Sequence, residues 1–152
     1  MPRKILVALD LSKISEELVL YGHSLAHRLD VQVDFLHALP HTSLWRGYEP
    51  WVPPELDMQV REIAQKKIAY WIRRAEEALP CEHCHEHQVF VEEGNPADLV
   101  ISKAKENGYN LIVVGHKGQS ALEHLIVGST ATNVVRYAHC SVLVYRPGLK
   151  VF

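Results

Sequence analysis

The sequence predicts an α/β fold in which a parallel sheet is covered by helices on both faces. Two observations support this. Short apolar runs of the length of buried strands recur along the chain, and stretches with helical spacing of apolar residues alternate with them. Right-handed crossovers can then place helices on both faces of the sheet. Because the chain has 152 residues, of which 47% are hydrophobic and 22% charged, a single globular domain over residues 1–152 is expected.

The first strand is expected at Ile5–Leu9, a continuous apolar run of the kind that is buried on both faces of a sheet. Small and apolar residues then recur every three or four positions, with polar residues between them, and predict a helix. These residues are Leu18, Gly22, Leu25 and Leu29.

The second strand is expected at Val31–His37, followed by an ordered loop at Ala38–Pro54 that is rich in proline and aromatic residues. The longest helical pattern covers Glu55–Leu79 and ends before Pro80, because proline cannot continue a helix. Its expected buried stripe consists of Val60, Ile63, Ala64, Lys67, Ile68, Trp71, Ile72, Ala75 and Leu79.

The third strand is expected at His87–Val91, and a helix follows it. Asn95 suits the N-cap of this helix, Pro96 suits its first position, and Gly108 suits its end. The remaining strands are expected at Leu111–Val114 and Val142–Tyr145. The last helix is expected at Ser129–His139, with Val134, Val135 and Ala138 on its inner face.

A glycine-rich segment follows the fourth predicted strand. It reads Gly115-His116-Lys117-Gly118 and, nine residues later, Gly128-Ser129. Glycine lets backbone N–H groups approach an anion closely, and the first turn of a helix has unpaired N–H groups with partial positive charge. The segment therefore predicts a phosphate site of a nucleotide, although neither the P-loop nor the dinucleotide motif matches. The alternative is an ordinary turn followed by a serine N-cap.

Asp10 also stands at the end of a predicted strand. In open parallel sheets, ligands bind beyond the carboxyl ends of the strands, where the strand order reverses. If the first and fourth strands are neighbours, one ligand can contact both Asp10 and Gly115. The alternative for Asp10 is a local Asx-type cap of the first helix, and Ser12 is expected to be a local cap as well.

Taken together, these motifs resemble the nucleotide-binding type of the universal stress protein family. The resemblance extends over nearly the whole chain. It rests on Asp10-x-Ser12, on Gly94-Asn95-Pro96-Ala97, on Asn110-Leu-Ile-Val-Val-Gly115, on the G-x-x-G-x9-G-S pattern and on Ala138–Val144. It implies a five-stranded parallel sheet in the order 3-2-1-4-5 and a site for ATP, ADP or AMP, with Mg²⁺ as a candidate cation.

The resemblance also implies which residues form this site. The adenosine would lie against Ala8, Leu9, Asp10 and Ala38. The ribose and phosphates would be bordered by Val114, Gly115 and Gly118, with Lys117 as a candidate cation. The phosphates would meet the helix start at Gly128, Ser129, Thr130 and Ala131. Ala131 stands where many nucleotide-binding members have a small hydroxyl residue, and this removes one phosphate donor.

The function implied by the resemblance is that of a nucleotide-gated binding and regulatory module in a stress response. No Ser-His-Asp or Cys-His catalytic arrangement can be assigned. The resemblance implies that bound ATP is hydrolysed slowly at most, with positioning by the glycine loop and a divalent cation. The family also implies a homodimer that forms through the last strand, Val142–Tyr145.

One segment, Cys81-Glu82-His83-Cys84-His85-Glu86-His87, lies outside the family pattern. Its C-x-x-C spacing can hold a soft metal ion, so Cys81, Cys84, His85 and His87 form a candidate zinc site. The alternative function is therefore a metal- or redox-sensing stress protein with a weak nucleotide site. The segment also admits interpretation as a polar loop or, by its C-x-x-C-H spelling, as a haem attachment pattern, which would require export.

The overall charge and hydropathy argue against two further classes of partner. A net charge of −2 and a pI near 6.5 argue against general nucleic-acid binding. No apolar run approaches the roughly 20 residues that span a membrane, and the apolar run near the N-terminus is too short for a signal sequence. A cytoplasmic location is expected. Three cysteines do not suggest a disulfide scaffold.

Overall fold

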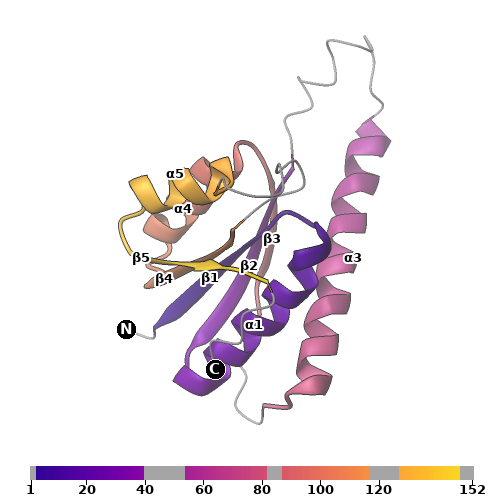
Figure 1. Ribbon diagram of the computed structural model, residues 1–152. Coiled ribbons are helices and arrows are strands. Elements are labelled where there is room, and N and C mark those ends of the chain that lie inside the picture. The colour runs from indigo at the N-terminus through magenta and orange to yellow at the C-terminus, as the bar shows by residue number, and fades with distance from the viewer. Residues whose placement is uncertain (1–2, 40–53, 82–86, 117–126, 148–152) are drawn as a thin grey trace.

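The computed structural model describes residues 3–39, 54–81, 87–116 and 127–147. Within these ranges, five strands and four helices alternate along the chain (Figure 1). They are β1 (Lys4–Leu9), α1 (Lys13–Leu29), β2 (Gln32–Leu39), α3 (Pro54–Ala78), β3 (Val89–Glu93), α4 (Pro96–Glu106), β4 (Leu111–Gly115), α5 (Ser129–Tyr137) and β5 (Ser141–Tyr145).

The five strands form one parallel sheet in the order β3-β2-β1-β4-β5. The predicted fold class and strand order are therefore confirmed. Helices α1 and α3 lie on one face of the sheet, and α4 and α5 lie on the other (Figure 1). No helix in the described part of the chain combines the length and apolar character needed to cross a membrane.

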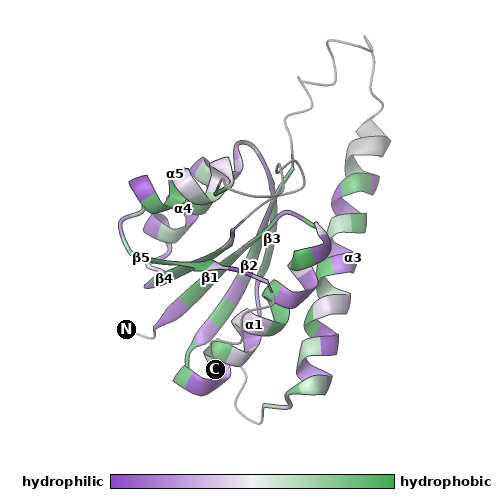
Figure 2. Ribbon diagram, in the orientation of Figure 1, coloured by the Kyte–Doolittle hydropathy of each residue, from purple (hydrophilic) through white to green (hydrophobic). Residues whose placement is uncertain are grey.

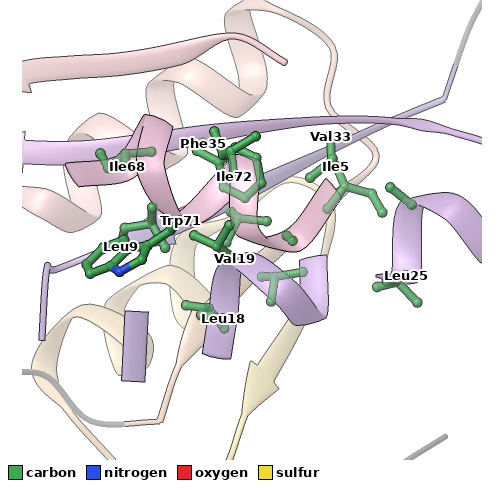
Figure 3. Close-up of a cluster of buried hydrophobic side chains, with 14 of the residues drawn as sticks. Ile5, Leu9, Leu18, Val19, Leu25, Val33, Phe35, Ile68, Trp71 and Ile72 are labelled. Carbon is green, nitrogen blue, oxygen red and sulfur yellow. The ribbon is translucent and has the colours of Figure 1, made fainter. Parts of the chain in front are cut away.

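The core consists of two hydrophobic clusters, one on each face of the sheet. Successive side chains of a strand point to opposite faces, so Ile5, Val7 and Leu9 enter the cluster under α1 and α3, while Leu6 enters the other. Figure 3 shows the first cluster, in which Phe35 and Trp71 meet residues of β1 and α1. This two-sided burial explains the continuous apolar run of β1, and Figure 2 shows hydrophobic residues concentrated along the central strands.

The predicted start of α4 is confirmed in detail. Pro96 is its first residue, and the Asn95 side chain accepts a hydrogen bond of 3.2 Å from the amide of Asp98. Gly108 follows the helix with a φ of +68°, a left-handed conformation that glycine adopts without strain. Local cap chemistry therefore determines both ends of this helix.

Several side chains expected in the core are exposed instead. On α3, Val60 is 44% and Ile63 is 63% exposed, whereas the adjacent Ala64 is buried in the core, so the covered stripe of this helix is narrower and begins later than predicted. Lys67 is also exposed, and its ammonium lies over the ring of Trp71. On α5, Val135 is 55% exposed while Val134 is fully buried, because the covered face of this short helix is narrower than predicted.

The third strand begins later than predicted, at Val89 instead of His87, and continues to Glu93. Contacts with β2 fix the residues just before this strand. The backbone N–H of Gln88 donates a hydrogen bond to the carboxylate of Asp34. The ring of His87 lies against the carbonyl of Val33. Glutamates can occupy the end of this strand because β3 is an edge strand and these residues are only half-buried.

Candidate functional site

The carboxyl ends of β1 and β4 separate from one another. The ladder between these strands ends with Val7 opposite Val113, although the strands continue to Leu9 and Gly115. On its other side, β1 stays paired with β2 up to Leu9 opposite His37. The strand order reverses at this point. The chain runs from β1 to β2 and β3 on one side of β1, and then returns to place β4 on the other side. Ligands of open α/β sheets bind at this kind of position.

Asp10 and Ser12 form a tight turn between β1 and α1. Oδ1 of Asp10 accepts hydrogen bonds from the amide of Ser12 at 2.9 Å and from the hydroxyl of Ser15 at 3.0 Å. The local Asx-type interpretation of Asp10 is therefore confirmed, and it fixes the carboxylate at the end of β1. Ser12 is the N-cap residue of α1, as expected, but its hydroxyl makes no cap hydrogen bond.

His37 joins this region from β2 and was missed by the sequence reasoning. Its side chain is 8% exposed, and its Nδ1 lies 2.8 Å from the carbonyl of Leu9. A carbonyl only accepts, so Nδ1 carries the hydrogen. Burial lowers the pKa of His37, although the hydrogen bond to Leu9 and the charge of Asp10 act in the opposite direction. The available signal was a titratable residue near the carboxyl end of a mostly apolar strand.

The amino terminus of α5 carries no side-chain cap. Its N-cap residue is Gly128, whose amide donates to the carbonyl of His116 at 2.8 Å. The amide of His116 in turn donates to the carbonyl of Tyr145, at the end of β5, also at 2.8 Å. These bonds attach the start of α5 to the carboxyl ends of β4 and β5. The first-turn amides of a helix attract anions, and here no side chain of the N-cap residue competes for them.

The other predicted nucleotide contacts are distributed around the same end of the sheet. Ala8 and Ala38 are half-buried near the ends of β1 and β2, and Val114 is 2% exposed. Gly115 pairs with Tyr145. Ser129 is exposed, Thr130 is half-buried, and the side chain of Ala131 is buried in the cluster under α4 and α5. Lys117 and Gly118 lie outside the described residues.

The predicted zinc ligands are described only in part, since Cys84 and His85 lie outside the described residues. Cys81 is disulfide-bonded, so its sulfur is not a thiolate that could bind a metal. His87 has Nδ1 3.0 Å from the carbonyl of Val33, and its Nε2 lies 3.5 Å from a carboxylate oxygen of Glu76. Across the four described ranges, no group of three or more His, Cys, Asp or Glu side chains is placed to hold a metal ion.

The fold and the arrangement at this end of the sheet define an open parallel α/β protein in which the carboxyl ends of β1 and β4 separate where the strand order reverses. The chain belongs to the universal stress protein family, whose family model matches residues 1–146. It is 32% identical over 146 residues to universal stress protein A homolog 2 of Coxiella burnetii, with 95% of this chain and 94% of that protein covered. It is 30% identical over 147 residues to universal stress protein YxiE of Bacillus subtilis, with 94% and 98% covered.

Solved structures share the fold at lower identity. The protein MJ0577 superposes with a TM-score of 0.75 at 21% identity, with 99% of both chains covered. A universal stress protein in complex with cAMP gives a TM-score of 0.64 at 19% identity, covering 95% of this chain and 97% of that one. The universal stress protein of Archaeoglobus fulgidus in complex with dAMP gives 0.63 at 21% identity, covering 95% and 98%.

Proposed function

We propose that this protein binds an adenine nucleotide between the carboxyl ends of β1 and β4, with the phosphates at the amino terminus of α5. The observation that carries the proposal is the meeting of three features at one end of the sheet. These are the separated ends of β1 and β4, the fixed carboxylate of Asp10, and a helix start whose N-cap residue is Gly128. The two structural relatives in complex with cAMP and dAMP support adenine as the base.

Each part of the ligand meets matching chemistry. A carboxylate can accept hydrogen bonds from ribose hydroxyls, and the carboxylate of Asp10 is fixed at the end of β1. The amides of the first turn of α5, at Ser129–Ala131, are suited to phosphate oxygens, and so are the hydroxyls of Ser129 and Thr130. Ala131 contributes through its main chain only, because its methyl side chain has no donor and is buried in the core. Ala8, Leu9, Ala38, Val114 and Gly115 border the adenosine in this proposal, and Lys117 and Gly118 belong to the phosphate loop.

A second copy of the chain is the proposed partner. Strand β5 pairs with β4 along one side and forms an edge of the sheet, with half-buried side chains from Val142 to Tyr145. Exposed strand edges favour pairing with another chain, and a twofold pair closes the assembly. Because the carbonyl of Tyr145 accepts from His116 in the phosphate loop, nucleotide binding can alter this edge. The protein would then act as a nucleotide-gated regulatory module.

Thermal unfolding in the presence of nucleotides tests the binding site. A ligand at a hundred times its dissociation constant adds about 2.7 kcal/mol to the unfolding free energy, so the melting temperature should rise with ATP, ADP or AMP. Mg²⁺ is varied because it commonly accompanies bound di- and triphosphates. The absence of any shift, with and without Mg²⁺, would overturn the proposal.

A pair of variants at Asp10 separates binding from folding. Asp10→Asn keeps an oxygen for Ser12 and Ser15 but removes the charge, whereas Asp10→Ala removes both local hydrogen bonds. We expect Asp10→Asn to melt close to the wild type and to bind nucleotide about tenfold more weakly. Asp10→Ala should lose both stability and affinity. The dimer is tested separately by sedimentation, where a mass that stays at 17.3 kDa at every concentration would contradict it.

A further inference from the structure

The turn between β1 and α1 contains a strained residue. Leu11 has a φ of +62°, in the left-handed region that a branched side chain rarely adopts. Such a conformation persists only where the surrounding contacts hold it, and it is concentrated at functional sites. The contacts that hold Leu11 therefore also hold the neighbouring carboxylate of Asp10.

Two sets of contacts fix this turn, one on each side of Leu11. On the helix side, Oδ1 of Asp10 accepts hydrogen bonds from the amide of Ser12 and from the hydroxyl of Ser15. Ser15 is a fully buried residue. On the strand side, Nδ1 of His37 donates to the carbonyl of Leu9 at 2.8 Å. The first set is local in the sequence. The second comes from a different strand and ties the turn to the core of the sheet.

His37 is well suited to this task. It lies opposite Leu9 in the ladder of β1 and β2, and its side chain is 8% exposed. An imidazole ring has few rotatable bonds, so a buried ring holds its hydrogen-bond partner in a narrow range of positions. The Nδ1 hydrogen is present in the required neutral tautomer and also in the protonated ring, so the contact to Leu9 does not depend on pH.

We propose that His37 is a positioning residue of the nucleotide site: by holding the carbonyl of Leu9, it fixes the strained turn and aims the Asp10 carboxylate at the ribose. This inference rests on the proposed function, because it assigns a role within the same site. His37 acts through Leu9 and Asp10 in this proposal and makes no contact with the nucleotide.

The chain offers a matched control in His23. This histidine is 2% exposed and its Nε2 also contacts a main-chain carbonyl, that of Leu79, at 2.9 Å. It lies on α1, roughly 16 Å along the helix axis from Ser12 at a rise of 1.5 Å per residue. Replacing either histidine by leucine removes one buried imidazole and one such hydrogen bond. The two variants should therefore lose similar stability, and only one of them should disturb the turn.

The first measurement needs no nucleotide. Amide hydrogen exchange of Ser12, whose N–H is bound to Asp10, reports directly on the turn. We expect His37→Leu to speed this exchange by about tenfold relative to the wild type, while His23→Leu leaves it unchanged. His37→Asn carries an amide N–H close to the place of Nδ1 and should restore the wild-type rate. Equal exchange in the wild type and His37→Leu would overturn the positioning role.

The second measurement is the dissociation constant for AMP and ATP by calorimetry. His37→Leu should bind about tenfold more weakly, His37→Asn within about threefold of the wild type, and His23→Leu like the wild type. If His23→Leu weakens binding as much as His37→Leu, the effect is one of general stability and the inference is wrong. If the wild type binds no nucleotide while His37→Leu still loosens Ser12, the proposed function fails and the turn assignment stands.

Discussion

The carbonyl of His116 accepts a hydrogen bond of 2.8 Å from the amide of Gly128. This bond joins the end of β4 to the N-cap position of α5 and so fixes where the helix begins relative to the sheet. It also uses the N–H group of Gly128, so the phosphate donors of the proposed site begin at Ser129. Gly128 contributes by having no side chain that would cap the helix in place of a phosphate.

Gly128 is the position at which helix stability and nucleotide affinity should move in opposite directions. Its φ of −55° and ψ of 154° are open to any residue, so substitution introduces no backbone strain. In Gly128→Asp, the carboxylate can cap the first-turn amides and favourably meets the helix dipole, which should add a few tenths to 1 kcal/mol, roughly, to stability. The same carboxylate repels the phosphate groups of a nucleotide and occupies the first-turn N–H groups that would otherwise bind them.

We therefore expect Gly128→Asp to raise the melting temperature slightly and to weaken nucleotide binding by at least about tenfold. Calorimetry and thermal unfolding measure the two effects on one sample. Gly128→Ala is the control, because it adds neither a cap nor a charge and should keep most of the affinity. Wild-type affinity in the aspartate variant would place the phosphates elsewhere.

Gly22 allows α1 to approach β1 closely. A Cβ atom at this position would lie 2.6 Å from Cγ2 of Val7, a buried side chain that has no room to move away. Gly22→Ala should destabilise the protein by about 1–3 kcal/mol through this overlap, less a gain of up to roughly 1 kcal/mol in helix propensity. Urea unfolding gives the change in free energy.

The overlap can be tested by removing its other partner. Val7→Ala alone creates a cavity and should destabilise the protein, but in that background Gly22→Ala should cost much less than in the wild type. Additive effects of the two substitutions would show that Gly22 is required for some reason other than contact with Val7.

Asp34 is a fully buried carboxylate that depends on its donors. It accepts from the hydroxyl of Tyr109 at 2.6 Å, from the amide of Gln88 at 2.9 Å and from the Gln32 side chain at 3.0 Å. Burial, together with the hydrogen bond to Asp34 and its charge, raises the pKa of Tyr109 far above its usual value. The pair thus joins β2 to the residues that precede β4.

Tyr109→Phe should destabilise the fold by about 1.5–3 kcal/mol, because a buried charged group loses a hydrogen bond. Chemical unfolding measures the loss. Tyr70→Phe serves as the matched control, since Tyr70 is 51% exposed and should change stability little. If the two variants were equally stable, Asp34 would not depend on the tyrosine hydroxyl.

The lowered pKa of His37 predicts a pH dependence of stability. The unfolded state, with a pKa near 6.5, binds a proton more readily than the folded state, so stability is full above about pH 6.5 and falls as the pH drops toward the folded pKa. In this window the slope from one such group is at most about 1.4 kcal/mol per pH unit. His37→Asn removes the contribution.

Melting curves of the wild type and His37→Asn between pH 7.5 and 5 would measure it, and the wild type should lose more stability on acidification. The other histidines are common to both proteins and cancel in the comparison. Parallel pH profiles would mean that burial of His37 does not disfavour its protonation.

Local patterns in the sequence sufficed for much of the fold. The apolar runs of β1 and β4 and the cap at Asn95 and Pro96 predicted strands and a helix start, because strand burial and cap hydrogen bonds involve neighbouring residues. The strand order followed from the family resemblance. That Asp10 and Gly115 stand at the ends of neighbouring strands depended on that order, since it places β1 beside β4.

The sequence by itself determined the alternation of strands and helices, the position of the glycine-rich segment after the fourth strand and the resemblance of the chain to the universal stress protein family. Only the tertiary structure decided that His37 holds the carbonyl of Leu9, that Tyr109 donates to Asp34, and that Val60 and Ile63 are exposed. The physical reason is the distance along the sequence over which each interaction acts. Periodicity and capping act within a few residues, whereas these contacts and exposures depend on where separate elements of the chain lie once they are packed.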